Sequence, residues 1–307
     1  MGIDRQLVYP TFGLMALLMI MYPDAHTFFG FDPAKYDRHK LGREGIVAHN
    51  NWASRTTNST HSRARPVGIV LTDSVEGMIR DAEKLLAAGI RALMIPAHTP
   101  PGGTSPADPA LDPFWRMAAD ANVPVTIHLG TEFGFLSSTA WSDNVEVFNP
   151  SSKSTLEFVI EPLRASTMHM AAENFLTALI LGGVFERHPH LRFGVIELSA
   201  SWVGPLSERL DMWAEQQFRS RLANVLSMRP SEYIARNVRV TPFYFEPIAD
   251  YLERYPNLSD IYCYSTDYPH FEGGMESKRV FSEALSGVSP DLRDKFFYRN
   301  GALLLPE

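Results

Sequence analysis

The sequence contains a single cysteine, Cys263, among its 307 residues. One cysteine cannot form a disulfide within the chain, and Cys263 lies inside an apolar run. Because disulfides are characteristic of oxidising compartments, we expect this protein to work in the reducing cytoplasm.

The sequence also lacks a hydrophobic run long enough to cross a membrane. The most apolar stretch, residues 14–22, is roughly half of the ~20 residues that a spanning helix needs. A secretory signal would place a small-residue cleavage site after this stretch, whereas Tyr-Pro-Asp-Ala-His follows it. We therefore expect these residues to belong to the core, and we expect no membrane partner.

Two further absences narrow the class of ligand. The formal net charge is -7, and Lys and Arg are scattered along the chain instead of forming a basic stripe, which argues against a nucleic-acid partner. No G-x-G-x-x-G motif opens a helix and no G-x-x-x-x-G-K-[ST] motif occurs, so the fingerprints of dinucleotide and P-loop binding are missing. A small-molecule substrate is the remaining expectation.

The chain does contain regularly spaced short runs that are rich in β-forming residues. Helical patterns lie between several of them, the clearest running from Ser74 to Gly89. The runs are almost continuously apolar, which is typical of parallel strands that helices cover on both faces. The predicted strands are residues 5–10, 66–72, 91–98, 123–130, 192–200, 238–246 and 260–267.

Polar residues stand at the carboxyl ends of many of these strands. The clearest are His98, His128, Glu197 and Asp267, and Thr72 and Glu246 are weaker cases. An open doubly wound sheet would gather its ligand at one crevice, whereas a closed (β/α) barrel brings all strand ends to one face. The spread favours a barrel. We expect one domain over residues 1–307, with an irregular insertion around 24–65 that includes a helix over 36–52.

His128 and Asp267 are the most informative of these strand ends. A neutral imidazole at a barrel mouth is a natural metal ligand, although a lone histidine is more often held by local hydrogen bonds. An ionised Asp267 at the end of a buried strand would be costly without a cation or several donors beside it. The residues alone leave two readings of Asp267 equally open, a metal or proton-handling role and the cap of a turn.

Several segments closely resemble one known family. They are "STDYPHFEGG", "VTIHLG", "LILGGVFERHPHLRFGVIELSASWVGPLSERLD" and "DKFFYRNGALLL", and the resemblance extends from about Ile3 to the C-terminus. The chain resembles the amidohydrolase-related family, the branch of the metal-dependent (β/α)8-barrel superfamily that includes aminocarboxymuconate semialdehyde decarboxylase and related aromatic acid decarboxylases. The resemblance implies an α/β fold, a (β/α)8 TIM barrel of the metal-dependent hydrolase type.

The resemblance also implies roles for three strand-end residues. His128 matches the family's fifth-strand metal ligand, and Asp267 matches the eighth-strand ligand that often handles a proton. Glu197 stands at the end of the sixth strand, where it would position substrate or water. A divalent metal ion is implied as the cofactor, and zinc is the expected metal.

The chain departs from the family pattern at its beginning. "GIDRQLVYPT" resembles the family's second strand, so the first strand and its metal-binding pair are missing. We expect either a preceding segment or a seven-stranded variant. The former is simpler, because a barrel without one strand exposes two unpaired edges. The only H-x-H motif, His188-Pro189-His190, precedes a strand and is expected to form a solvated turn on the opposite face.

Other residues near the expected mouth are candidates for the substrate pocket. These are His98, His169, Trp202, Tyr268 and His270. The aromatic residues Phe133, Phe135 and Trp141 of the long loop after the fifth strand would suit a flat substrate, but plain loop packing explains them at least as well. Arg164 is the nearest candidate for gripping a substrate carboxylate.

Three functions fit these expectations. The first is metal-dependent hydrolysis of a small organic substrate, with Asp267 accepting a proton from water. The second is decarboxylation of an aromatic or unsaturated carboxylic acid, with Asp267 passing a proton to the carbon that loses carbon dioxide. The third is a non-catalytic barrel that has lost its metal and acts as a binding partner. The resemblance further implies a homodimer or larger homo-oligomer.

Overall fold

A parallel β-sheet forms the centre of the molecule in the computed structural model, which describes residues 3–132, 134–136, 140–142, 144–148, 161–268, 270 and 273–307. Five strands follow one another in chain order, and every neighbouring pair is parallel. They are β3 (Gly68–Ile69), β4 (Leu93–Met94), β5 (Val125–His128), β6 (Phe193–Ile196) and β7 (Val238–Val240). Tyr262 continues the sheet through a parallel bridge to Val240.

At the other end of the sheet, β1 (Gln6–Val8) pairs in parallel with β2 (Ala64–Pro66). Only Val67 separates β2 from β3, so residues 64–69 form one extended segment whose first half contacts β1 and whose second half contacts β4. All residues of β5, β6 and β7 are buried, as expected for strands covered on both faces.

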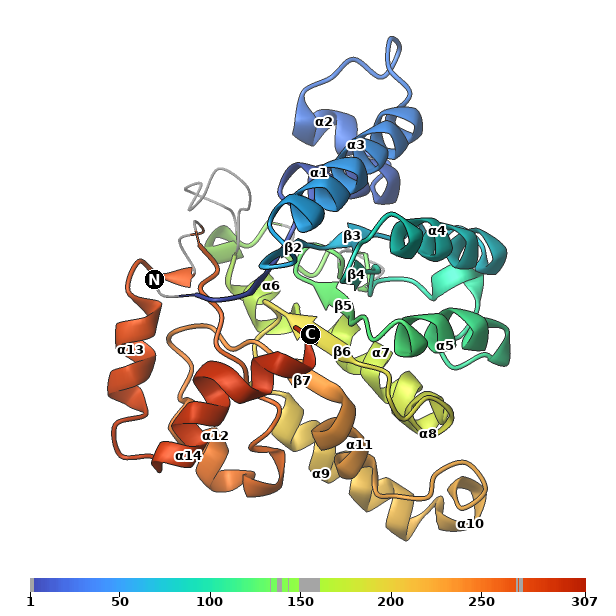
Figure 1. Ribbon diagram of the computed structural model, residues 1–307. Coiled ribbons are helices and arrows are strands. Elements are labelled where there is room, and N and C mark those ends of the chain that lie inside the picture. Colours follow the sequence, from blue (N-terminus) through green and yellow to red (C-terminus); the bar gives the residue numbers. More distant parts are fainter. Residues whose placement is uncertain are drawn as a thin grey trace.

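Helices surround this sheet, as Figure 1 shows. The helices that follow the sheet strands are α4 (Val75–Ala87), α5 (Asp112–Asp120), α6 (Pro162–Thr167), α7 (Met170–Leu181), α8 (Val184–Arg187), α9 (Val203–Gln216), α10 (Arg219–Leu222), α11 (Pro230–Asn237) and α12 (Ile248–Arg254). Ser74 accepts a hydrogen bond from Gly77 N and begins α4 where the sequence predicts it. The predicted α/β fold with parallel strands is confirmed.

The barrel wall is open at one place. Among the described residues, β1 pairs only with β2, and Tyr262 bridges only to β7. The wall is therefore not closed between β1 and the segment 262–267.

Residues 12–59 form a helical projection at the top of Figure 1. It consists of α1 (Phe12–Met21), α2 (Ala25–Phe29) and α3 (Arg38–Ser59). The apolar residues of α1 pack against α3, as expected for core residues. The segment 24–65 is more regular than predicted, because α3 is longer than the helix expected over 36–52. In the part of the chain that is described, no helix is both long and apolar enough to cross a membrane.

Two side chains of α3 take the place of a neighbouring strand beside residues 67–69. The amide of Asn50 donates to Ile69 O at 2.9 Å and accepts from Ile69 N at 2.8 Å. His49 Nε2 lies 2.8 Å from Val67 O. Buried backbone groups next to the end of β1 are thereby satisfied.

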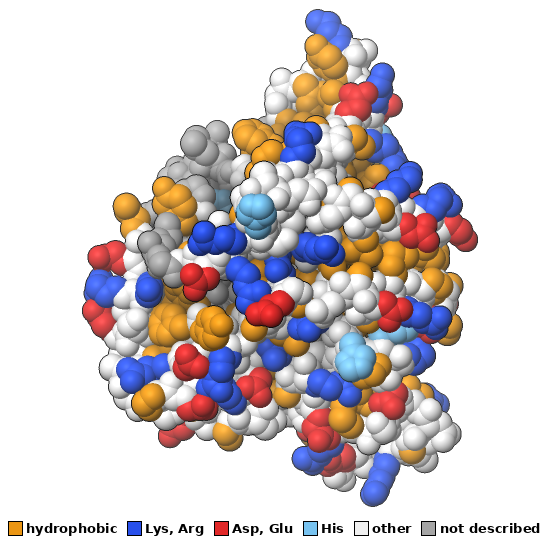
Figure 2. Space-filling view, in the orientation of Figure 1, with side chains coloured by type: hydrophobic (Ala, Val, Ile, Leu, Met, Phe, Trp, Pro, Cys, Tyr) orange, Lys and Arg blue, Asp and Glu red, His pale blue; other side chains and the backbone are white. Residues whose placement is uncertain are grey.

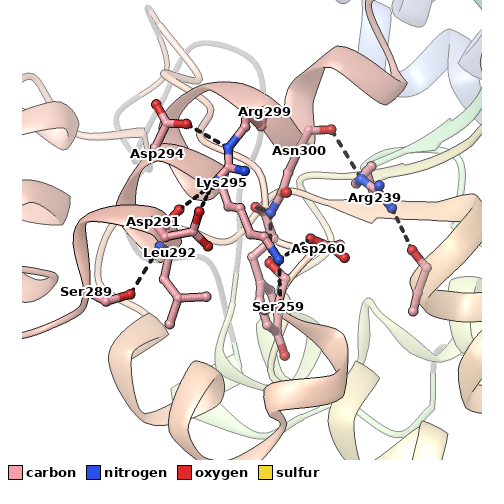
Figure 3. Close-up of polar contacts among 12 residues, drawn as sticks. Arg239, Ser259, Asp260, Ser289, Asp291, Leu292, Asp294, Lys295, Arg299 and Asn300 are labelled. Carbon is pink, nitrogen blue, oxygen red and sulfur yellow. Dashed lines mark hydrogen bonds and ion pairs between the residues drawn. The ribbon is translucent and has the colours of Figure 1, made fainter.

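The C-terminal part of the chain supports the segment that leads to Asp267. It contains α13 (Ser277–Ala284), α14 (Pro290–Asp294) and a π-helical segment, Lys295–Arg299. Figure 3 shows the following residue, Asn300, whose amide donates to Ser259 O and Tyr262 O, both at 2.9 Å. In the same view Arg239 donates to Asn300 O at 3.2 Å.

Basic side chains gather on one face, in contrast to their expected scatter. Figure 2 shows Lys and Arg side chains near the middle of the face in view. Arg5 and Arg91 are close enough to Arg65 to help lower its pKa, although burial is the larger cause. These three arginines stand at or near strand starts, so they lie on the face opposite the strand ends.

The Asn300 contacts predict a measurable contribution to stability. Asn300→Ala would leave two carbonyl groups without their donor in a buried position, and we expect the free energy of unfolding to fall by about 1–3 kcal/mol. Arg299→Ala is the control, because its partners Asp291 and Asp294 are exposed and surface ion pairs contribute about 0–1 kcal/mol. Urea denaturation measures both. Equal effects of the two changes would contradict the prediction.

Candidate functional site

Three strand ends converge at one face of the barrel. His128 is the last residue of β5, Glu197 follows β6, and Asp267 ends the segment that starts at Tyr262. The carboxylate of Glu197 lies between two histidines: Oε2 is 2.9 Å from His128 Nε2, and Oε1 is 3.3 Å from His270 Nδ1. His270 Nδ1 is also 2.9 Å from Asp267 Oδ1. The structure therefore brings together all three strand-end residues to which the sequence assigns a role.

The imidazole of His128 is fixed on both of its nitrogens. Nδ1 donates to Leu129 O at 2.7 Å, which aims Nε2 at Glu197. The ring of Tyr9 stacks on the imidazole, with centroids 4.5 Å apart and planes 21° from parallel. Burial favours neutral His128, but the charge of Glu197 and its hydrogen bond outweigh burial and raise the pKa of His128.

Glu197 is buried and has an unusual backbone conformation. Its φ of 62° is in the left-handed region, which costs a non-glycine residue of the order of 1–3 kcal/mol. Its N–H donates to Thr241 Oγ1 at 3.0 Å, just beyond the end of β7. Burial would raise the pKa of the Glu197 carboxyl, but the positive charge and hydrogen bond of His128 dominate and lower it.

Asp267 also has a left-handed backbone, with φ of 47°. The turn is closed by His270 N, which donates to Asp267 O at 2.8 Å. Gly273 packs against this turn: a Cβ there would lie 2.6 Å from Thr266 O and 2.7 Å from Asp267 Cβ. The first glycine of the "EGG" motif therefore leaves room for Asp267.

The two oxygens of the Asp267 carboxyl differ in their contacts. Among the described residues, none donates a hydrogen bond to the buried Oδ2, while Oδ1 faces His270. Burial, together with the nearby charge of Glu197, raises the pKa of Asp267 to about 7. Hydrogen bonds to the carboxylates of Asp267, which has the larger effect, and Glu197 raise the pKa of His270 to about 11. Asp267 and His270 therefore hold a proton between them near neutral pH.

A cavity of about 810 Å³ opens onto this cluster. His128, Glu197, Asp267, Tyr268 and His270 line it. Its aromatic walls come from Tyr9, Tyr264, Phe297 and Tyr298, and its cationic lining residues are Arg5 and Lys278. Residues 3–11 and 263–268, which form the two open edges of the wall, also line the cavity. The cavity therefore extends along the opening between β1 and the segment 262–267.

Three of the predicted pocket residues lie outside this lining. His169 stacks on Trp202, with ring centroids 6.1 Å apart, and the Trp202 indole donates to Leu198 O and Ser199 O. His98 is half-buried, and no described residue makes a hydrogen bond to its Nδ1. Their roles in substrate binding stay predictions.

The long loop after β5 is only partly described. Phe133 lies outside the described residues, and Trp141 is 71% exposed. Phe135 packs at the margin of the core. Arg164, the candidate for a substrate carboxylate, donates to Glu132 Oε1 at 3.2 Å and does not line the cavity.

The H-x-H motif lies on the far face, but it is not simply a solvated turn. His188 is buried, and its Nε2 lies 3.0 Å from Asp112 Oδ1 at the start of α5. His190 is exposed. The expectation of a solvated turn is therefore wrong for His188, because α5 supplies a carboxylate partner that the sequence spacing does not reveal.

Two residues of the site were missed by sequence reasoning. Tyr9 follows β1 directly and Thr241 follows β7 directly, the same position relative to a strand that drew attention to His128. Neither is a common metal ligand, so nothing distinguished them from other strand-end residues. Their contacts with His128 and Glu197 depend on the arrangement of strands in space.

The raised pKa of His270 predicts a pH dependence of stability. The folded state keeps this proton up to a pKa of about 11, whereas the ordinary value is 6.5. Between these values the folded state binds more protons than the unfolded state, so the free energy of unfolding of the metal-free protein falls as pH rises from about 6.5 to about 11. Urea denaturation across this range should show a shallower fall for His270→Gln. Identical slopes would contradict the assignment.

The fold of this chain is similar to that of several solved structures. A search of curated proteins found no match. Among solved structures, an amidohydrolase from Mycobacterium avium subsp. paratuberculosis K-10 is 22% identical with a TM-score of 0.73, and the alignment covers 98% of this chain and 70% of that one. 5-Carboxyvanillate decarboxylase LigW from Sphingomonas paucimobilis is 16% identical with a TM-score of 0.64, covering 99% and 79%.

A third similar structure contains a metal. It is a dihydroxybenzoic acid decarboxylase from Polaromonas sp. JS666 with bound manganese and the inhibitor 2-nitroresorcinol, 15% identical with a TM-score of 0.59, covering 87% of this chain and 76% of that one. At these identities the likeness concerns the fold. The family model described as amidohydrolase matches residues 16–306, nearly the whole chain, and the protein therefore belongs to the amidohydrolase family.

Proposed function

We propose that this protein is a divalent-metal-dependent enzyme that decarboxylates an aromatic carboxylic acid. The observation that carries the proposal is the convergence of Glu197, Asp267 and His270, whose ligand atoms all lie within 4.8 Å of one another at the mouth of the barrel. Family membership supports an enzyme, and decarboxylases are prominent among the similar structures. The sequence analysis puts hydrolysis first and decarboxylation second, and this proposal reverses that order.

The residues present fit a divalent metal ion. Two carboxylates and one imidazole are suitable ligands. In the part of the chain that the structure describes, the buried Asp267 Oδ2 has no donor, and a cation would satisfy it. Glu197, Asp267 and His270 would hold the ion, and His128 faces the same carboxylate from the other side. The oxygen-rich set favours manganese over the zinc expected from the sequence, and manganese is bound in similar structures.

The cavity suits an aromatic acid. Tyr9, Tyr264 and Phe297 offer flat apolar walls, and Lys278 adds a positive charge that would attract a substrate carboxylate. When bound, the metal would act as a Lewis acid that polarises a substrate oxygen. The carboxylate-bearing C–C bond would break, carbon dioxide would leave, and Asp267 would transfer a proton to the ring carbon that keeps the electron pair.

Hydrolysis of an amide, ester or lactone is the second candidate. Its support is the similarity to an amidohydrolase structure and the placement of Asp267, whose carboxylate could accept a proton from water as readily as it could donate one to carbon. The two candidates differ in product, because only decarboxylation releases carbon dioxide.

The metal assignment predicts weaker binding when His270 is removed. Titration of the purified protein with Mn²⁺ alone should give a dissociation constant at least about 10-fold larger for His270→Ala than for the unchanged chain. His190→Ala is the matched control, because His190 is exposed on the far face and should leave the affinity unaltered. Equal affinities of all three proteins would contradict the assignment. No Mn²⁺ binding by the unchanged chain would favour the non-catalytic reading.

The proposed proton transfer predicts that Asp267→Asn loses activity. Carbon dioxide release from a panel of hydroxybenzoic and carboxyvanillic acids should fall by about 10²–10⁴-fold in this variant, the usual contribution of a positioned general acid. Asp120→Asn, a change at the exposed end of α5, controls for the loss of one negative charge. An unchanged rate in Asp267→Asn would overturn the role, and turnover of esters or amides without carbon dioxide would favour hydrolysis.

A further inference from the structure

We propose that Glu246 is a positioning residue, which holds the loop after β6 so that Glu197 faces the other groups of the proposed metal site. The inference rests on the proposed function and deepens it. Glu246 follows β7, and its side chain is buried in a position that the proposed reaction does not use. From the sequence alone, Glu246 is only one of the weaker strand-end candidates.

The Glu246 carboxylate joins two loops. Within its own loop, Oε1 accepts from Phe243 N at 2.7 Å. Across to the loop after β6, Oε2 accepts from Ala200 N and from Ser199 Oγ, both at 3.0 Å. Tyr251 Oη also donates to Oε2, at 3.3 Å. Burial raises the pKa of the Glu246 carboxyl, while the hydrogen bonds from Ala200, Phe243, Ser199 and Tyr251 act in the opposite direction by stabilising its ionised form.

The loop that Glu246 holds needs such support. Glu197 and Ser199 both have left-handed backbones, with φ of 62° and 61°, a conformation that non-glycine residues rarely adopt. Strained backbone of this kind persists only where surrounding contacts determine it. Thr241 fixes Glu197 N from one side, and Glu246 fixes the residues just beyond Glu197.

The contacts distinguish positioning from catalysis. The hydrogen-bond partners of Glu246 are Phe243, Ser199, Ala200 and Tyr251, none of which belongs to the cluster of His128, Glu197, Asp267 and His270. Glu246 also does not line the cavity. It can therefore act on metal or substrate only through the conformation of residues 197–200.

Glu246→Gln tests the inference, with Asp211→Asn as the matched control. Glutamine keeps the size of the side chain but replaces one carboxylate oxygen with an NH₂ group. That group would face the donors that now contact Glu246, such as the N–H groups of Phe243 and Ala200. Asp211 likewise accepts from a backbone N–H and a hydroxyl, those of Ser231, at 2.8 and 2.7 Å, but it joins α9 to α11 away from the site. Both variants should therefore lose stability by a similar mechanism.

Two readouts separate positioning from plain structural support. In the metal-free protein, hydrogen exchange of the amides in residues 197–202 should be at least about 10-fold faster in Glu246→Gln and unchanged in Asp211→Asn. The dissociation constant for Mn²⁺ should be about 10–100-fold larger in Glu246→Gln, the usual effect of losing a group that orients a ligand, and unchanged in Asp211→Asn.

Faster exchange with an unchanged Mn²⁺ affinity would overturn the inference, because the loop would then be supported without any effect on Glu197. Unchanged exchange would overturn it as well. If the unchanged chain binds no Mn²⁺, the proposed function fails separately, and exchange alone decides whether Glu246 holds the loop. Should Glu246→Gln not fold, Ser199→Ala removes a single donor, and the same two readouts apply with smaller expected changes.

Discussion

The arrangement of the site depends on the burial of two neighbouring carboxylates, those of Glu197 and Asp267, at the mouth of a barrel. Two buried, ionised carboxylates repel one another and lose their hydration, so they require positive charge beside them. In the metal-free protein, His128 and His270 supply it from opposite sides of Glu197. The raised pKa of His270, the proton held beside Asp267 and the suitability of the cluster for a divalent ion are consequences of this one constraint.

The scaffold holds these groups at a cost in backbone strain. Glu197 and Asp267 both have left-handed backbones, and each is held by contacts from a neighbouring element. For Glu197 these are Thr241 and the proposed support of Glu246, and for Asp267 they are the close approach of Gly273 and the turn to His270. A parallel barrel suits this purpose, because its rigid strands fix where each loop begins while the loops remain free to differ.

The sequence predicts the parts of this site that depend on position along a strand. His128, Glu197 and Asp267 were found because an apolar run ends at each of them, and the β–α alternation indicates which face they share. Contacts that depend on packing in three dimensions were not predictable: the stacking of Tyr9 on His128, the hydrogen bond of Thr241, and the return of His270 to both carboxylates. The burial of His188 against Asp112 was missed for the same reason.

Manganese-edge anomalous diffraction from crystals soaked in Mn²⁺ would test the central claim most directly. The account predicts an anomalous peak between Glu197, Asp267 and His270, with ligand distances of about 2.0–2.3 Å, typical of carboxylate and imidazole ligands. A peak on the far face near His190, or an ion that contacts none of these three residues, would contradict it.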